Sequence, residues 1–233
     1  MKSKLHYLFE AEAKAQLLFD TLEQRHVIQS GITEKELNAS VYALAFELFG
    51  IKKYWHKRIV RAGKNTLLPY KHNPPNLTLQ KEDILFLDFG PVFEDWEADF
   101  GRTYVIGSNA AKIKLKADIE AAWHEGQMHY QKHKDAITGA ELYAFSQQLA
   151  TKYGWEFGNK HCGHLIGNFP HEKIQGEEVI NYIHPDNTTP MSAFDKLGQR
   201  RFWIYEIHFV DKALEIGGFF EQMIDTQEAN LST

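Results

Sequence analysis

The chain has 233 residues, of which 43% are hydrophobic and 24% are charged, an ordinary composition for a folded domain. Its formal net charge of −5 leaves no basic footprint for nucleic acid or an anionic membrane. The single cysteine excludes an internal disulfide, and no apolar run approaches the roughly 20 residues that span a bilayer. We therefore expect one cytoplasmic domain over residues 1–233, without nucleic-acid or membrane partners.

The first half of the chain predicts two helices followed by strands. Apolar side chains recur at helical spacing over residues 4–29. Thr33 and Glu36 form a capping box that opens a second helix, and Gly50 ends it. Short apolar or β-branched runs then predict strands, at residues 58–61, 84–87 and 104–106.

The second half repeats this order. Residues 110–133 predict a third helix, and Thr138 with Glu141 forms another capping box for a helix that ends at Gly154. Both boxes lie in the pattern Ile-Thr-x-x-Glu-Leu. Capping boxes are common, so a chance match is one interpretation, and two similar halves of the chain are the other. Strands and turns are expected over residues 157–226.

Four carboxylates occupy positions that two hairpins would pair. If the first hairpin turns at residues 93–94, Asp88 lies directly opposite Asp99. The same arithmetic pairs Glu206 with Glu221. Directly opposed residues on antiparallel strands have Cβ atoms about 4.5–5.5 Å apart. Each hairpin would therefore set two carboxylates side by side.

Such carboxylate pairs indicate a metal site. Like charges repel unless one takes a proton or a cation lies between them, and apolar neighbours make unpaired carboxylates costly. Oxygen ligands with one imidazole suit Mn, Fe, Co or Zn, and bridging carboxylates can hold two ions. The alternative is that the four acids are exposed on solvated strand faces, where Asp and Glu ordinarily lie.

A glycine-flanked loop supplies candidate nitrogen ligands. His161, His164 and His171 lie within eleven residues, and clustered histidines commonly bind metal or move protons. Cys162 has no evident base and is expected to be inert packing. His72, beside a proline pair, would by itself be an ordinary loop histidine.

Together these motifs resemble the pita-bread metallopeptidases, which include Xaa-Pro aminopeptidases, prolidases, methionine aminopeptidases and creatinase. The resemblance covers nearly the whole chain and implies an α+β pita-bread fold. In that fold two pseudo-symmetric halves form an antiparallel sheet covered by helices. The segments that carry the resemblance are Asp88-Phe89-Gly90, Asp99 with Arg102-Thr103, Gly163-His164 with Ile166-Gly167, His171-Glu172, Glu206 and Glu221.

The resemblance implies a site for two divalent ions, with Mn, Co, Fe and Zn all open. Asp99 and Glu221 would bridge the two ions, and Asp88 would bind one of them. The implied metal ligands are Asp88, Asp99, His164, Glu206 and Glu221.

The resemblance also implies catalytic roles for three residues. A metal-activated water would attack the scissile carbonyl, and Glu206 would act as general base. His72 and His171 would contact the substrate and steady the tetrahedral intermediate.

The implied function is a metal-dependent aminopeptidase that acts on short peptides. Arg102-Thr103 and the region of His72 resemble the Xaa-Pro branch, whereas residues 162–164 are closer to methionine aminopeptidase. Creatinase-like C–N hydrolysis of a small molecule also stays open, as does a homodimer. From another class, the alternative is a non-catalytic peptide- or protein-binding member. We expect no counterpart of the N-terminal domain that larger members carry. The chain departs from the proline-specific pattern at Lys160, Ile207 and Phe219.

Overall fold

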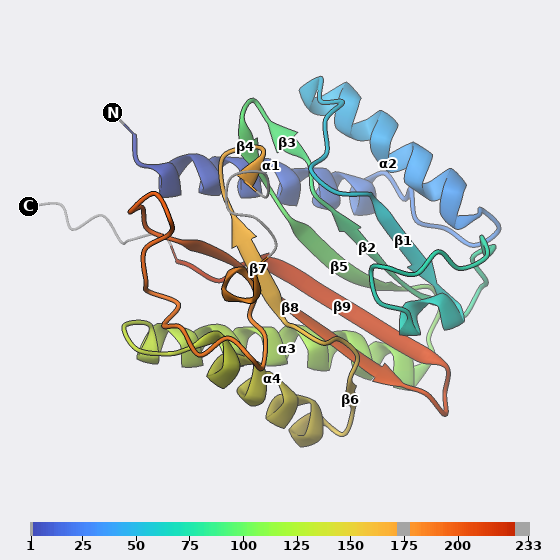
Figure 1. Cartoon of the computed structure of the whole chain (residues 1–233). Helices are drawn as coiled ribbons and strands as arrows, with labels where there is room; N and C mark the ends of the chain where they lie inside the picture. Colours follow the sequence, from blue (N-terminus) through green and yellow to red (C-terminus); the bar gives the residue numbers. More distant parts are fainter. Residues whose placement is uncertain (1, 172–177, 227–233) are drawn as a thin grey trace, which may run out of the picture.

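The computed structural model describes residues 2–171 and 178–226, and two long hairpins form its centre (Figure 1). Within these ranges, no helix is long and apolar enough to cross a membrane. The first half contains α1 (Lys4–Gln24), α2 (Glu34–Phe49), β1 (Ile59–Ala62), β2 (Ile84–Phe89), β3 (Val92–Phe93), β4 (Trp96–Glu97) and β5 (Phe100–Val105). The second half contains α3 (Ala110–His133), α4 (Gly139–Tyr153), β6 (Glu156–Phe157), β7 (Gly163–Ile166), β8 (Phe202–Asp211) and β9 (Ile216–Met223). Short 3-10 helices lie at Gly63–Leu67 and Val179–Asn181.

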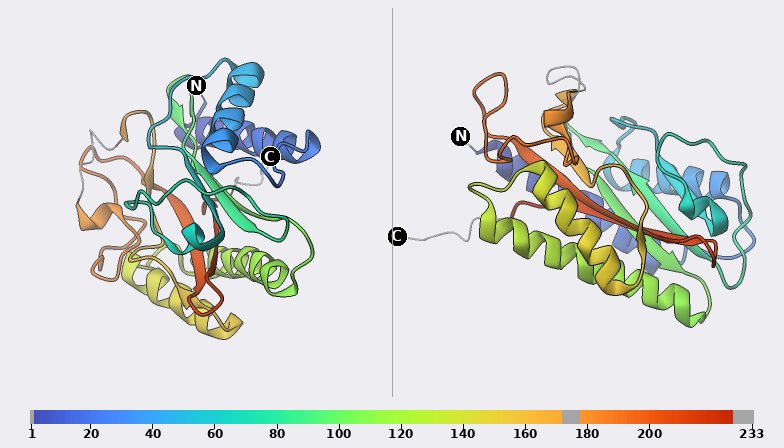
Figure 2. Two further views of the ribbon diagram at one scale, coloured as in Figure 1. Left: turned by 90° about the vertical axis from the view of Figure 1, so that its right-hand side faces the viewer. Right: turned by 60° about the horizontal axis from the view of Figure 1, so that its bottom comes forward.

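The two hairpins share one antiparallel sheet, in the order β1-β2-β5-β9-β8-β6, with β7 also paired to β8. The hairpin β2–β5 meets the hairpin β8–β9 through β5 and β9. Helices α1 and α2 lie beside the first hairpin, and α3 and α4 beside the second (Figures 1 and 2). This arrangement confirms the expected α+β fold with two similar halves.

Both predicted capping boxes are present. The hydroxyl of Thr33 accepts from the backbone N–H of Glu36 at 3.2 Å, and that of Thr138 accepts from Glu141 at the same distance. In each box the glutamate accepts in return from the threonine backbone N–H at 2.8 Å. The first helix, by contrast, ends at Gln24 instead of residue 29, because the chain turns at residues 25–26.

Alternation along the strands separates a helix-packed face from a second face of the sheet. On β8, Trp203, Tyr205 and Ile207 are buried in the core beneath α3 and α4. On β2, Leu85 and Leu87 belong to the core beneath α1 and α2. Because successive side chains of a strand point to opposite faces, Asp88 and Glu206 point to the face opposite these side chains.

The predicted register of the first hairpin is wrong by two residues. Asp88 lies opposite Gly101, not Asp99, because the turn is centred on residues 94–95. Phe93 is buried in the core beneath α1 and α2 and pairs with Trp96, so an exposed turn cannot include it. The charged Glu94, with a positive φ of 59°, occupies the turn instead.

Candidate metal centre

Three of the predicted acids lie in one row across the second face of the sheet. Glu206 lies directly opposite Glu221, which confirms the predicted register of the second hairpin. Glu221 in turn lies opposite Gly101, and Gly101 opposite Asp88. A Cβ at Gly101 would come within 2.6 Å of the Phe219 ring. The glycine therefore keeps the middle of the row clear.

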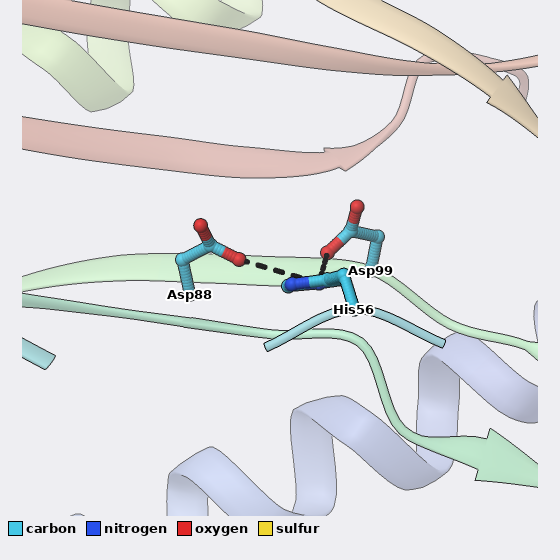
Figure 3. A group of neighbouring side chains, drawn as sticks. All are labelled: His56, Asp88 and Asp99. Atoms are coloured by element: carbon cyan, nitrogen blue, oxygen red, sulfur yellow. Dashed lines mark hydrogen bonds and ion pairs between the residues drawn. The ribbon is translucent and has the colours of Figure 1, made fainter. Parts of the chain in front are cut away.

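The fourth acid, Asp99, lies just before β5 and faces two imidazoles. Its Oδ2 is 3.1 Å from Nε2 of His164, and its Oδ1 is 3.1 Å from Nε2 of His56. The same His56 nitrogen is 3.5 Å from Oδ1 of Asp88 (Figure 3). His164 is 3.9 Å from Oε1 of Glu221. Asp99 therefore connects the carboxylates of both hairpins through the two rings.

The position of His164 follows from β7. This strand pairs His164 with Ile204, two residues before Glu206, so both side chains point to the same face. Gly163 adopts a φ of 142°, and a Cβ there would lie 2.1 Å from the carbonyl oxygen of Ile204. Only glycine fits this close approach, which explains why it precedes the histidine.

The acids are almost fully buried, with exposed fractions of 8% for Asp88, 2% for Asp99, 5% for Glu206 and 3% for Glu221. Burial raises the pKa of Asp88 to about 7, against the opposing pull of His56. Burial and the nearby charges of Asp99 and Asp88 raise the pKa of Glu221 well above its ordinary value. For Asp99 burial acts in the same direction, but His56 and His164 outweigh it and lower the pKa to about 2.

The pKa values of the two imidazoles depend on the acids that face them. Burial lowers the pKa of His56, but Asp99 and Asp88 outweigh it and raise the pKa to about 9. Burial likewise opposes protonation of His164, and contacts with Asp99 raise its pKa to about 9. The facing carboxylates therefore favour the protonated form of both rings in metal-free protein.

Two buried oxygens of the row are left without a hydrogen-bond partner among the described residues, Oε1 of Glu206 and Oε2 of Glu221. Nδ1 of His161 lies 2.9 Å from Oε1 of Glu206 but is not aligned for a hydrogen bond. A buried carboxylate oxygen without a donor is costly, and a divalent cation removes that cost. The donor set of carboxylates and imidazoles therefore fits divalent metal. Two overlapping groups have ligand atoms within 4.8 Å of one another: His56, Asp88 and Asp99, and Asp99, His164 and Glu221.

His171 lies beside this cluster and is held by a buried acid. Glu97 accepts from the backbone N–H of His171 at 3.1 Å, and its other oxygen contacts Nδ1 of the ring. The ring of His171 stacks parallel to that of His164, with centroids 6.4 Å apart. Trp55 packs edge-on against both rings, at 5.2 Å from His164 and 5.3 Å from His171.

The structure does not bring every predicted residue to the cluster. His72 lies in an exposed loop, where its backbone carbonyl accepts from Lys57 and Arg61. No contact of its imidazole with the four acids is found in the described part of the chain. Cys162 is buried, and burial raises the pKa of its thiol, as expected for packing. Glu172 lies outside the described residues.

Three residues of the site were missed from the sequence: Trp55, His56 and Glu97. One signal could have found His56, because it follows Thr33 by 23 residues, just as His161 follows Thr138 by 23. The echo of the two capping boxes thus marks a histidine in each half. No comparable local pattern marks Glu97, which reaches His171 across 74 residues.

The chain is similar in sequence to known proteins over part of their length. The chain is 28% identical over 160 residues to a Xaa-Pro dipeptidase of Lactobacillus helveticus, covering 66% of this chain and 42% of that protein. It is 30% identical over 101 residues to methionine aminopeptidase 1 of Saccharomyces cerevisiae, covering 43% of this chain and 26% of that protein. The chain thus spans less than half the length of these relatives.

Solved structures show the same fold. A prolidase from Pyrococcus horikoshii OT3 matches with a TM-score of 0.73 at 19% identity, over 96% of this chain and 59% of that one. An X-Pro aminopeptidase from Thermotoga maritima matches with a TM-score of 0.71 at 20% identity, over 97% and 61%. These likenesses confirm the pita-bread fold. The sequence model that describes metallopeptidase family M24 matches residues 7–194 of this chain. The chain therefore belongs to that family.

Proposed function

We propose that the protein hydrolyses short peptides at the bond after the N-terminal residue, with preference for proline in the second position, and that it uses two divalent ions. The observation that carries this proposal is the convergence of four buried acids and His164 on one face of the sheet. Membership of the metallopeptidase family and the similarity to a Xaa-Pro dipeptidase support the substrate class.

The donor set supports two overlapping ion positions. Asp88 lies on the β2 side of the cluster, whereas Glu206 and His164 lie on the β8 side. Asp99 and Glu221 lie between them and would contribute to both positions. This division follows the two hairpins, each of which supplies two carboxylates.

Bound divalent ions would polarise the scissile carbonyl and make an attacking water more acidic. Glu206 would accept the proton of that water through Oε1, which has no aligned hydrogen-bond donor among the described residues. Glu97 contacts Nδ1 of His171 and accepts from it, so Nε2 would donate to the carbonyl oxygen, as negative charge develops there, only when both ring nitrogens carry a proton. His72, on an exposed loop, would be a further contact of the same substrate.

Activity after metal replacement tests the proposal. Protein stripped with a chelator and reloaded with Mn, Co or Zn is assayed on Xaa-Pro dipeptides, Xaa-Pro tripeptides and Met-Ala peptides. We expect Xaa-Pro cleavage, and a loss of about 10²–10⁴-fold in Glu206→Gln, because general base catalysis contributes roughly that much. No turnover of any peptide would contradict the proposal.

The same panel separates the remaining activities. The similarity to methionine aminopeptidase 1 favours Met-Ala cleavage as the second candidate. Cleavage of dipeptides but not tripeptides would indicate a dipeptidase instead of an aminopeptidase. A non-catalytic binder would bind peptides without turning them over, and the intact set of buried donors argues against that class.

A further inference from the structure

The two imidazoles at Asp99 come one from each half of the chain. His164 lies on β7, which flanks the second hairpin, and His56 lies three residues before β1, which flanks the first. Each presents Nε2 to a different oxygen of Asp99 at 3.1 Å. Each half of the chain therefore contributes two carboxylates to the cluster and one imidazole to Asp99.

The outer nitrogen of each ring has the same backbone partner. Nδ1 of His56 is 2.8 Å from the carbonyl oxygen of Lys57, and Nδ1 of His164 is 2.8 Å from that of Leu165. Because the carbonyl only accepts, Nδ1 carries the proton, and in a neutral ring Nε2 then carries the lone pair. Metal-ligating histidines commonly have this second-shell hydrogen bond, which sets the tautomer and the ring orientation.

The loop that carries His56 is built around the cluster. The backbone N–H of Trp55 donates to the carbonyl of Gly90 at 2.9 Å, and its indole N–H donates to Ala98 at 3.0 Å. A Cβ at Gly90 would lie 2.2 Å from Cδ2 of His56, so the ring fills space that only glycine leaves open. The side chain of His56 is 8% exposed.

We propose that His56 is a sixth protein ligand, which binds through Nε2 the ion held by Asp88 and Asp99. The inference rests on the proposed two-ion site and makes it symmetric, with one imidazole for each ion. The donor spacing supports it, because bonds of about 2.0–2.1 Å in tetrahedral geometry place ligand atoms roughly 3.3–3.4 Å apart. The distances from Nε2 of His56, 3.1 Å and 3.5 Å, bracket that value.

An imidazole on the first ion changes the metal that this position prefers. Three carboxylates alone would suit Mn or Mg, whereas a nitrogen donor favours Zn or Co. Asp88, Asp99 and Glu221 are those three carboxylates. Loss of His56 should therefore weaken Zn binding at the first position more than Mn binding.

Nitrogen NMR of the Zn-loaded protein tests the ligand directly and does not depend on activity. With ¹⁵N-labelled histidine, we expect metal-shifted Nε2 resonances that include one lost in His56→Ala and another lost in His164→Ala. Equilibrium dialysis should show that His56→Ala retains one Zn tightly and binds the second at least about 10–100-fold more weakly, the usual cost of disturbing even an outer-shell partner. His133→Ala, a change at the exposed end of α3, is the matched control and should bind both ions as the unmodified protein does.

Several outcomes would overturn the inference. An unshifted His56 resonance in the Zn-loaded protein would exclude ligation, and so would unchanged binding of two Zn ions by His56→Ala. Reduced turnover with unchanged metal binding would instead make His56 a substrate contact. Retention of one tight ion shows that the variant is folded, and His56→Gln repeats the test if His56→Ala is unstable. If the unmodified protein cleaves no peptide while His56 still ligates Zn, the proposed function fails and the ligand assignment stands.

Discussion

The two halves bring the same kinds of side chain, two carboxylates and an imidazole, to Asp99 and its neighbours by different local structures. In the second hairpin, Glu206 and Glu221 are direct partners in the β ladder, and His164 lies on a paired strand. In the first hairpin, Asp88 lies opposite a glycine, and Asp99 and His56 approach from outside the ladder. The comparison shows that pseudo-symmetry can extend to donor type without extending to register, because only the final positions of the donor atoms matter to a cation.

The largest expected effect is at Asp99, where the halves meet. Asp99→Asn removes a charge that faces both imidazoles, so we expect both ion positions to weaken together and peptidase activity to fall by more than about 10–100-fold. Dialysis and kcat/KM measure these losses. Asp95→Asn, in the exposed turn of the same hairpin, is the control. Loss of one ion with full retention of the other would show that the halves act independently.

The metal-free protein should lose stability as pH rises. Although burial lowers the pKa of His56 and His164, the facing carboxylates raise both to about 9. A folded-state pKa above the unfolded value of about 6.5 means that the folded state binds more protons, so the stabilisation is full below about pH 6.5 and is lost as pH rises through 9. Urea unfolding of chelator-treated protein should show a fall of a few kcal/mol across that range.

Single variants show how much of this pH dependence of stability each half of the chain contributes. His56→Ala and His164→Ala should each flatten the metal-free profile in part, and metal-loaded protein, whose imidazoles are neutral, should lack the slope. An unchanged profile in both variants would show that other groups cause it.

A smaller effect is expected at Glu97, which positions His171. Glu97→Gln cannot accept from Nδ1 of His171 as a charged carboxylate does, so we expect kcat/KM to fall about 10–100-fold while metal content stays unchanged. Glu94→Gln, in the exposed turn of the same hairpin, should have no effect. Lost metal in Glu97→Gln would contradict a role limited to His171.

The smallest effects compare the two capping boxes. Thr33→Ala and Thr138→Ala should each lower the free energy of unfolding by about 1 kcal/mol, the usual value of a helix N-cap. If the halves unfold as one cooperative unit, both variants shift the same thermal transition. Two separate transitions, each moved by one variant, would show that the halves unfold independently. Thr151→Ala, on the exposed surface of α4, is the control.

The sequence alone determined the features that depend on near neighbours. Both capping boxes join residues three apart, and the short turn of the second hairpin was enough to place Glu206 opposite Glu221. The motif resemblance indicated the fold and the five candidate ligands, whose roles stay a proposal.

Only the tertiary structure decided the contacts that cross the chain. Asp99 meets His56 across 43 residues, and Glu97 meets His171 across 74. The first hairpin also took its register from burial of Phe93, which a count of residues from the turn does not include. These contacts depend on how loops close over a packed sheet, and packing is a property of the whole fold, not of any short segment.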